Sequence, residues 1–182
     1  MTAPTTPEFS RPISVSRLGS DAASYRIEAK PAETAALASR FGIPAVHRLE
    51  ALVSLQRRPG GDIAFVAELR AAVTQSCVVT LAPLEVTIDE PFTLVFRAGI
   101  DEDEADRIAL ENLEDEIVEP LVDDVIDIGE VVAQQLALAL DPYPRSPEVA
   151  AEGEGQVLGD GDLDAPLQPE NPFAVLKRLT KS

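Results

Sequence analysis

The sequence predicts an α+β fold, with a curved antiparallel sheet at about residues 12–97 packed against one helix at about 127–140. Two observations predict it. Apolar and polar side chains alternate along residues 49–56 and 63–73, which is typical of half-buried strands. Apolar residues then recur at helical spacing over 128–140. A chain of 182 residues, 45% of them hydrophobic, is long enough for one compact core with tails.

The first elements follow from local signals. Residues Ile13 to Leu18 have the composition of a short strand. A helix is predicted to open near Lys30, because Pro31 suits the first turn. Gly42 is a natural stop for it, and Pro44 prevents its continuation.

The two alternating segments form a predicted long β-hairpin, since the turn signal Arg57 to Asp62 lies between them. Alternation resumes over residues 84–88 and continues over 92–96. Pro91 interrupts this last strand and cannot donate a backbone hydrogen bond. We therefore expect the strand to be bent or to lie at the edge of the sheet.

The helix at about 127–140 has a capping signal in front of it. Asp127 can accept a hydrogen bond from the backbone N–H of Glu130, while the Glu130 side chain reaches back toward Asp127. Pro142 and Pro144 end this helix.

The chain is expected to have three parts. Residues 1–142 form the α+β domain and contain an acidic loop at about 101–126. Residues 143–170 are rich in Pro, Gly, Asp and Glu and form a predicted disordered linker, because they cannot bury enough apolar surface to offset the cost of ordering. Residues 171–182 form a short C-terminal motif that either docks on its own domain or binds a partner.

Charge is concentrated in one window. Residues 101–130 contain 14 acidic residues and one basic residue, which is −13 of the net charge of −17. This balance excludes a surface that mainly grips nucleic acid. Two interpretations stay open, namely a solvated acidic loop and a docking segment for a basic partner. The candidate partner-binding residues are Asp101, Glu102, Asp103, Glu104, Glu114, Asp115 and Glu116 in this window, with Phe173 and Leu176 in the C-terminal motif.

Metal and catalytic chemistry have few candidates. One Cys and one His exclude a disulfide framework and cannot supply a structural zinc site from one chain, so we expect no metal, no cofactor and no catalytic residue. His47 is interpreted as a surface or structural histidine, or as a general base. Cys77 is interpreted as a buried thiol, or as a reactive thiolate. With no secretory signal at the N-terminus, we expect a cytoplasmic protein without a membrane or small-molecule partner.

Three segments together resemble the YceD family, the large ribosomal RNA subunit accumulation proteins. They are residues 76–84, residues 126–132 leading into 135–140, and residues 171–177. The resemblance covers roughly residues 45–180. Its motif positions are Cys77, Asp127, Asn171, Pro172 and Phe173.

The resemblance implies a non-enzymatic role in the synthesis, processing or stability of 23S ribosomal RNA, and therefore in large-subunit assembly. It implies a ribosomal protein or a particle preceding the large subunit as the partner. The chain departs from the family at the first motif, which typically holds Cys-x-x-Cys, because Thr80 stands where the second cysteine would be. A family metal site is therefore not expected here.

Other functions are kept open. The protein could bind precursor ribosomal RNA directly if its basic residues formed a local patch, it could be a generic acidic module that holds a basic partner, or it could be a processing enzyme. The residues considered for the patch are Arg40, Arg48, Arg57, Arg58, Lys177, Arg178 and Lys181.

Overall fold

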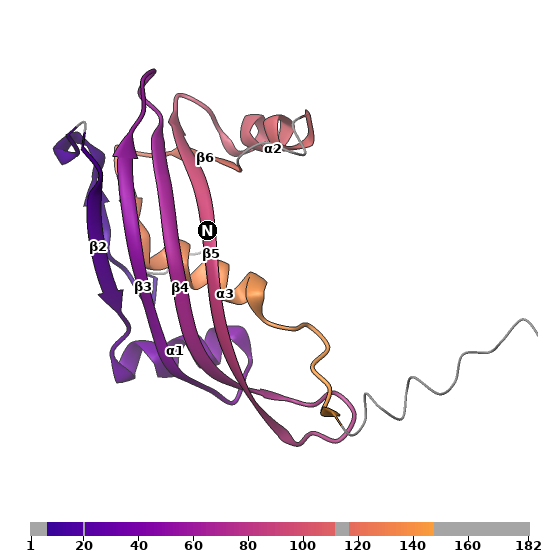
Figure 1. The fold of residues 1–182 in the computed structure, drawn as a ribbon. Coiled ribbons are helices and arrows are strands. Elements are labelled where there is room, and N and C mark those ends of the chain that lie inside the picture. The colour runs from indigo at the N-terminus through magenta and orange to yellow at the C-terminus, as the bar shows by residue number, and fades with distance from the viewer. Residues whose placement is uncertain (1–6, 20, 112–116, 148–182) are drawn as a thin grey trace, which may run out of the picture. The chain divides into compact units, whose positions relative to one another are not determined.

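The computed structural model describes residues 7–19, 21–111 and 117–147. The chain divides into two units, residues 1–146 and 147–182, and every helix and strand described here lies in the first. That unit is an α+β arrangement in which helix α3 (Ile128–Ala139) runs behind a five-stranded sheet (Figure 1). The predicted fold class and the helix predicted at about 127–140 are confirmed.

The five strands lie in the order β2-β3-β4-β5-β6. Their bounds are Ala23–Glu28, Ala45–Arg57, Ile63–Ser76, Pro83–Ala98 and Val118–Leu121. Neighbours are antiparallel except β5 and β6, which are parallel. The prediction of a wholly antiparallel sheet is wrong at this pair, because residues 99–117 supply the crossover connection that a parallel strand needs.

The predicted hairpin is confirmed as β3 and β4, which pair from Ala45 opposite Thr74 to Arg57 opposite Ile63. Its turn uses Gly60 and Gly61 at φ +104° and +100°, a region that favours glycine. A register shift between Val46 and Arg48 leaves His47 as an extra residue in β3.

The N-terminal segment differs from the expectation. Strand β1 covers only Pro12–Ser14 and pairs with β7 (Val125–Asp127) in a separate two-stranded sheet. A 3-10 helix follows at Val15–Arg17, and the first strand of the main sheet is β2, which the sequence reading missed. Arg57 holds this turn, because its side chain donates a 2.8 Å hydrogen bond to the Val15 carbonyl.

The acidic window is not a continuous loop, as was expected for about 101–126. It contains helix α2 (Glu102–Glu111) and strands β6 and β7. Asp101 caps the start of the helix, and Ala105 is buried. A helix can therefore form here, because Asp101 caps it and the side chains of Glu102 and Asp103 stay exposed to solvent.

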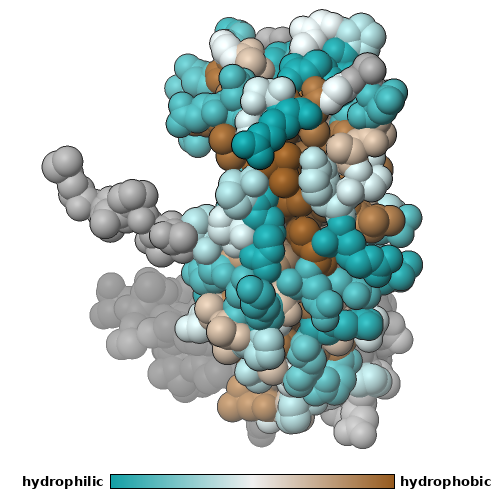
Figure 2. All heavy atoms as spheres, turned by 90° about the vertical axis from the view of Figure 1, so that its left-hand side faces the viewer, coloured by the Kyte–Doolittle hydropathy of each residue, from teal (hydrophilic) through white to brown (hydrophobic). Residues whose placement is uncertain are grey.

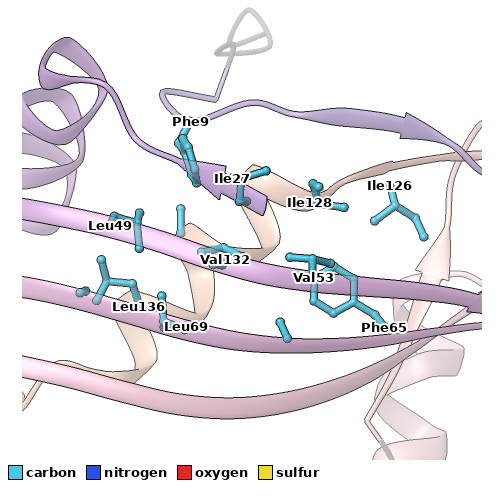
Figure 3. Packing of buried hydrophobic residues seen from close by; sticks show 14 of the residues in the cluster. Phe9, Ile27, Leu49, Val53, Phe65, Leu69, Ile126, Ile128, Val132 and Leu136 are labelled. Carbon is cyan, nitrogen blue, oxygen red and sulfur yellow. The ribbon is translucent and has the colours of Figure 1, made fainter. Parts of the chain in front are cut away.

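The core lies on one face of the sheet, where α3 crosses it (Figure 3). Val132 and Leu136 of α3 are fully buried together with Leu49 and Leu69 of the hairpin. Phe9, which precedes β1, is also fully buried and belongs to the same cluster. Strand β2 forms an edge of the five-stranded sheet. Seen from this side, hydrophilic residues cover most of the surface and leave a narrow hydrophobic strip (Figure 2).

Two further segments complete the unit. Helix α1 (Pro31–Phe41) ends at Gly42, whose φ is +65°. After α3 the chain returns to the turn between β4 and β5, where the Val78 N–H donates to the Pro144 carbonyl at 2.8 Å. The first residues of the predicted disordered linker are therefore held in place, and residues 148–170 lie outside the described ranges.

Candidate protein-interaction surface

The first turn of α2 presents four carboxylates. Asp101, Glu102 and Asp103 are exposed, and Glu104 is half-buried. The Oδ1 atom of Asp101 accepts the Glu104 N–H at 2.9 Å and caps the helix. Acidic residues at a helix N-terminus also interact favourably with the helix dipole. This turn is therefore an ordered group of acids that solvent and a basic partner can reach.

Glu119 of β6 adds a fifth acid to this surface. Burial raises its pKa above the ordinary value, and the nearby carboxylates of Asp106 and Glu102 raise it further. A nearby cation would offset this repulsion. Sequence reasoning missed Glu119, since the pairing of β5 with β6 has no local signal.

The remaining members of the predicted partner-binding set lie outside the described residues. They are Glu114, Asp115, Glu116, Phe173 and Leu176. The same holds for the family-motif positions Asn171 and Pro172. Their part in partner binding stays a prediction.

Asp127 connects the N-terminal segment to α3. Its Oδ1 accepts the backbone N–H groups of Arg11 at 2.6 Å, Gly129 at 3.1 Å and Glu130 at 3.2 Å, and its Oδ2 accepts the Ser10 hydroxyl. The capping role of Asp127 is confirmed. The Glu130 side chain does not reach back as expected, because it forms an ion pair with Arg40 at 2.7 Å.

Cys77 is fully buried at the turn after β4. A hydrogen bond from the Thr80 side chain, with others from the backbone N–H groups of Thr80, Ser146 and Val79, lowers the pKa of the Cys77 thiol to about 6. The Ser146 N–H lies 3.4 Å from Sγ. The thiol is thus a hydrogen-bond acceptor that fastens the segment after α3, and the described ranges contain no cluster of three metal-ligating side chains.

The basic residues of the alternative patch are not gathered in one place. Arg40 binds Glu8 and Glu130, and Arg48 lies beside Glu50 at 3.8 Å. Arg57 lies nine positions along β3 from Arg48, which is about 30 Å at the rise of a strand. Lys177, Arg178 and Lys181 lie outside the described ranges.

His47 lies in a hydrogen-bonded group on the outer side of the sheet. Its Nε2 is 2.7 Å from the Thr74 hydroxyl, and that hydroxyl donates to Glu85 at 2.7 Å. The hydroxyl proton is directed at the carboxylate, so His47 is not placed to remove it. His47, Thr74 and Glu85 thus connect β3, β4 and β5 at the bulge in β3.

Comparisons with known proteins give one match. A family model described as "Large ribosomal RNA subunit accumulation protein YceD" matches residues 65–180, well over half of the chain. No curated protein and no solved structure matches this chain. In the described part of the chain, no helix is long and apolar enough to cross a membrane.

Proposed function

Since the chain belongs to the YceD family of large ribosomal RNA subunit accumulation proteins, we propose that it supports the synthesis, processing or stability of 23S ribosomal RNA as a non-enzymatic factor. The family match carries this proposal. It begins in β4 and extends through α3 toward the C-terminus, so it includes the acidic first turn of α2.

The acidic surface supports a protein partner. The charge of −13 in residues 101–130 attracts cations, while the described basic residues are spread over the unit and several of them, including Arg40, Arg48 and Arg97, are paired with acids. Ribosomal proteins are strongly basic. The first turn of α2 would hold such a protein through electrostatic attraction and keep it from unspecific contacts until it meets RNA.

The outer face of the sheet offers a second contact. Leu52 of β3 is 44% exposed and Val66 of β4 is 47% exposed, on the side opposite to α3. Arg26, Glu68 and Arg70 lie around Leu52. A surface with exposed apolar residues among charges of both signs suits docking to an assembling particle.

The acidic surface is tested with Glu102→Gln, Asp103→Asn and Glu104→Gln in one chain. Asp101 is kept because it caps the helix. We expect these changes to reduce the ribosomal proteins that co-purify with the full chain. Asp21→Asn, Glu28→Gln and Asp141→Asn remove the same charge from exposed positions outside residues 101–130 and should have little effect. Equal recovery with both variants would reject the acidic turn as the contact.

Direct binding of RNA is distinguished by salt. A protein that neutralises phosphates loses affinity steeply as salt increases. Filter binding of precursor RNA to the pure full chain should therefore show weak binding with a shallow dependence on salt. Tight binding with a steep slope would favour RNA as the direct partner.

A further inference from the structure

Strand β5 has a long free side. It has 16 residues, and β6 pairs only with Val95–Ala98. Among the described residues, no strand pairs with the free side of residues 83–94. Unpaired N–H and C=O groups along a strand edge are a template for another strand.

The direction of these backbone groups is fixed by one hydrogen bond. The Val95 N–H donates to the Ile117 carbonyl at 2.9 Å, on the side away from β4. Pairing of β4 with β5 has no register shift, so every second residue before Val95 faces the same way. Thr87, Asp89 and Thr93 therefore direct their N–H groups to the free side. The backbone nitrogen of Pro91 also faces the free side, because Pro91 lies four residues before Val95. Its lack of an N–H group therefore removes no hydrogen bond between β4 and β5.

An apolar groove lies beside this edge. The core-facing residues of β5 are only half-buried at Val86, Phe92 and Leu94, because α3 covers them incompletely. A cavity of about 150 Å³ lies between β5, β6 and α3. It is lined by Leu94, Phe96, Ile117, Glu119, Val131, Gln134, Gln135 and Leu138. Leu138 of α3 is 79% exposed at this site.

The charges around the edge are acidic. Glu85 and Asp89 are exposed on the outer side of β5, Glu90 is exposed on the groove side, and Glu119 lines the cavity. Arg70 is 3.3 Å from Asp89, and the described residues provide no ion-pair partner for Glu90. A second copy of this chain would place like charges opposite one another, which is unfavourable. A basic segment fits this edge.

We infer that the free side of β5 and the groove toward α3 bind an extended segment of a basic protein, in which apolar and basic residues alternate. The segment adds to β5 as a strand. Its apolar side chains enter the groove at Leu94, Val131 and Leu138, and its Lys and Arg side chains face Glu85 and Asp89. This inference rests on the proposed function and specifies the form of its partner.

The probe is a fluorescent ten-residue peptide of alternating valine and lysine, measured by anisotropy on the full chain. A peptide of the same composition with the valines and lysines in two blocks is the comparison. We expect the alternating peptide to bind at least about tenfold more tightly, because only it matches the period of a strand. Equal affinity would show attraction by charge alone and would overturn the inference.

The groove is tested with Leu138→Lys, and Leu81→Lys is the matched control because Leu81 is 77% exposed in the β4–β5 turn. We expect Leu138→Lys to weaken binding about tenfold and Leu81→Lys to change it little. Amide exchange gives an independent measurement on the unaltered chain. The N–H groups of Thr87, Asp89 and Thr93 should become protected on binding, and protection at β2 or α2 instead would overturn the inference.

The same variants separate this inference from the proposed function. If Leu138→Lys loses the peptide but restores large-subunit RNA in depleted cells, the edge is not the site of the partner and the proposed function stands. If depletion leaves large-subunit RNA unchanged, the proposed function fails. The partner at this edge would then have another role.

Discussion

Replacing Asp127 by alanine should destabilise the domain strongly. One carboxylate accepts hydrogen bonds from Ser10, Arg11, Gly129 and Glu130. It therefore caps α3 and holds the segment that leads from Phe9 into β1. Alanine leaves the four donors without this acceptor.

The expected size follows from the bonds lost. Loss of a helix N-cap costs about 1 kcal/mol. Each hydrogen bond to a charged group contributes about 1.5–3 kcal/mol, so the two bonds from Ser10 and Arg11 bring the total for Asp127→Ala to about 4–7 kcal/mol. That is a large part of a total stability of about 5–15 kcal/mol. Asp127→Asn keeps an Oδ1 acceptor for the three backbone N–H groups, so we expect a loss of only about 1–2 kcal/mol.

Urea unfolding followed by circular dichroism measures both variants. We expect the slope of the unfolding free energy against urea concentration to stay unchanged. The urea concentration at the midpoint of unfolding should decrease strongly for Asp127→Ala and less for Asp127→Asn. Equal losses of stability in the two variants would show that the negative charge of Asp127, rather than the position of its acceptor oxygens, stabilises the contact between the N-terminal segment and α3. A loss below about 1 kcal/mol for Asp127→Ala would show that the hydrogen bonds to Asp127 do not stabilise the domain as expected.

Three further predictions concern other parts of the fold. Gly129→Ala should cost about 1–3 kcal/mol in urea unfolding, because a Cβ there would lie 2.2 Å from the Phe9 carbonyl oxygen; unchanged stability would contradict this packing. Glu119→Gln should stabilise the domain at neutral pH, and the gain should shrink as the pH falls through the raised pKa of Glu119 and be absent below the ordinary glutamate pKa, because a raised pKa penalises only the ionised form. A gain that does not depend on pH would contradict that cause. The thiolate absorbance of Cys77 should titrate near pH 6, and at a higher pH in Thr80→Val. The stabilisation from the thiolate should be lost as the pH falls through about 6. An identical titration midpoint in the variant would exclude Thr80 as the main hydrogen-bond donor.

The strongest sequence signals were local and periodic. The hairpin and α3 were predicted because alternation persists over residues 49–56 and 63–73 and helical spacing persists over residues 128–140. For the strand that holds Pro91 the sequence predicted either a bend or an edge position, because proline cannot donate to a neighbouring strand, and Pro91 lies on the side of β5 that no described strand pairs with.

The missed elements depend on distant partners. Strand β2 has only six residues and is stabilised by its pairing with β3. Phe9 is buried because Asp127, more than a hundred residues later, fixes the adjoining backbone. Among the side chains of α2 that the structure describes, Ala105 is the buried one, and acidic residues dominate the sequence pattern of this helix.

The candidate site was predicted only in part. The acids of the first turn of α2 were found from the charge count, because a local excess of carboxylates is visible in a sequence. The groove beside β5 was not found, since Leu94, Glu119 and Leu138 come from three elements that meet only in the folded unit. Exposed leucines carry no signal of their own.

The most direct test of the proposed role is a sucrose gradient of cells depleted of this protein, with precursor and mature 23S RNA measured against small-subunit RNA. We expect a deficit of large subunits and of 23S RNA with small subunits intact, restored by the unaltered chain and poorly by the variant of Glu102, Asp103 and Glu104. A normal ratio of large-subunit to small-subunit RNA after depletion would contradict the proposed function.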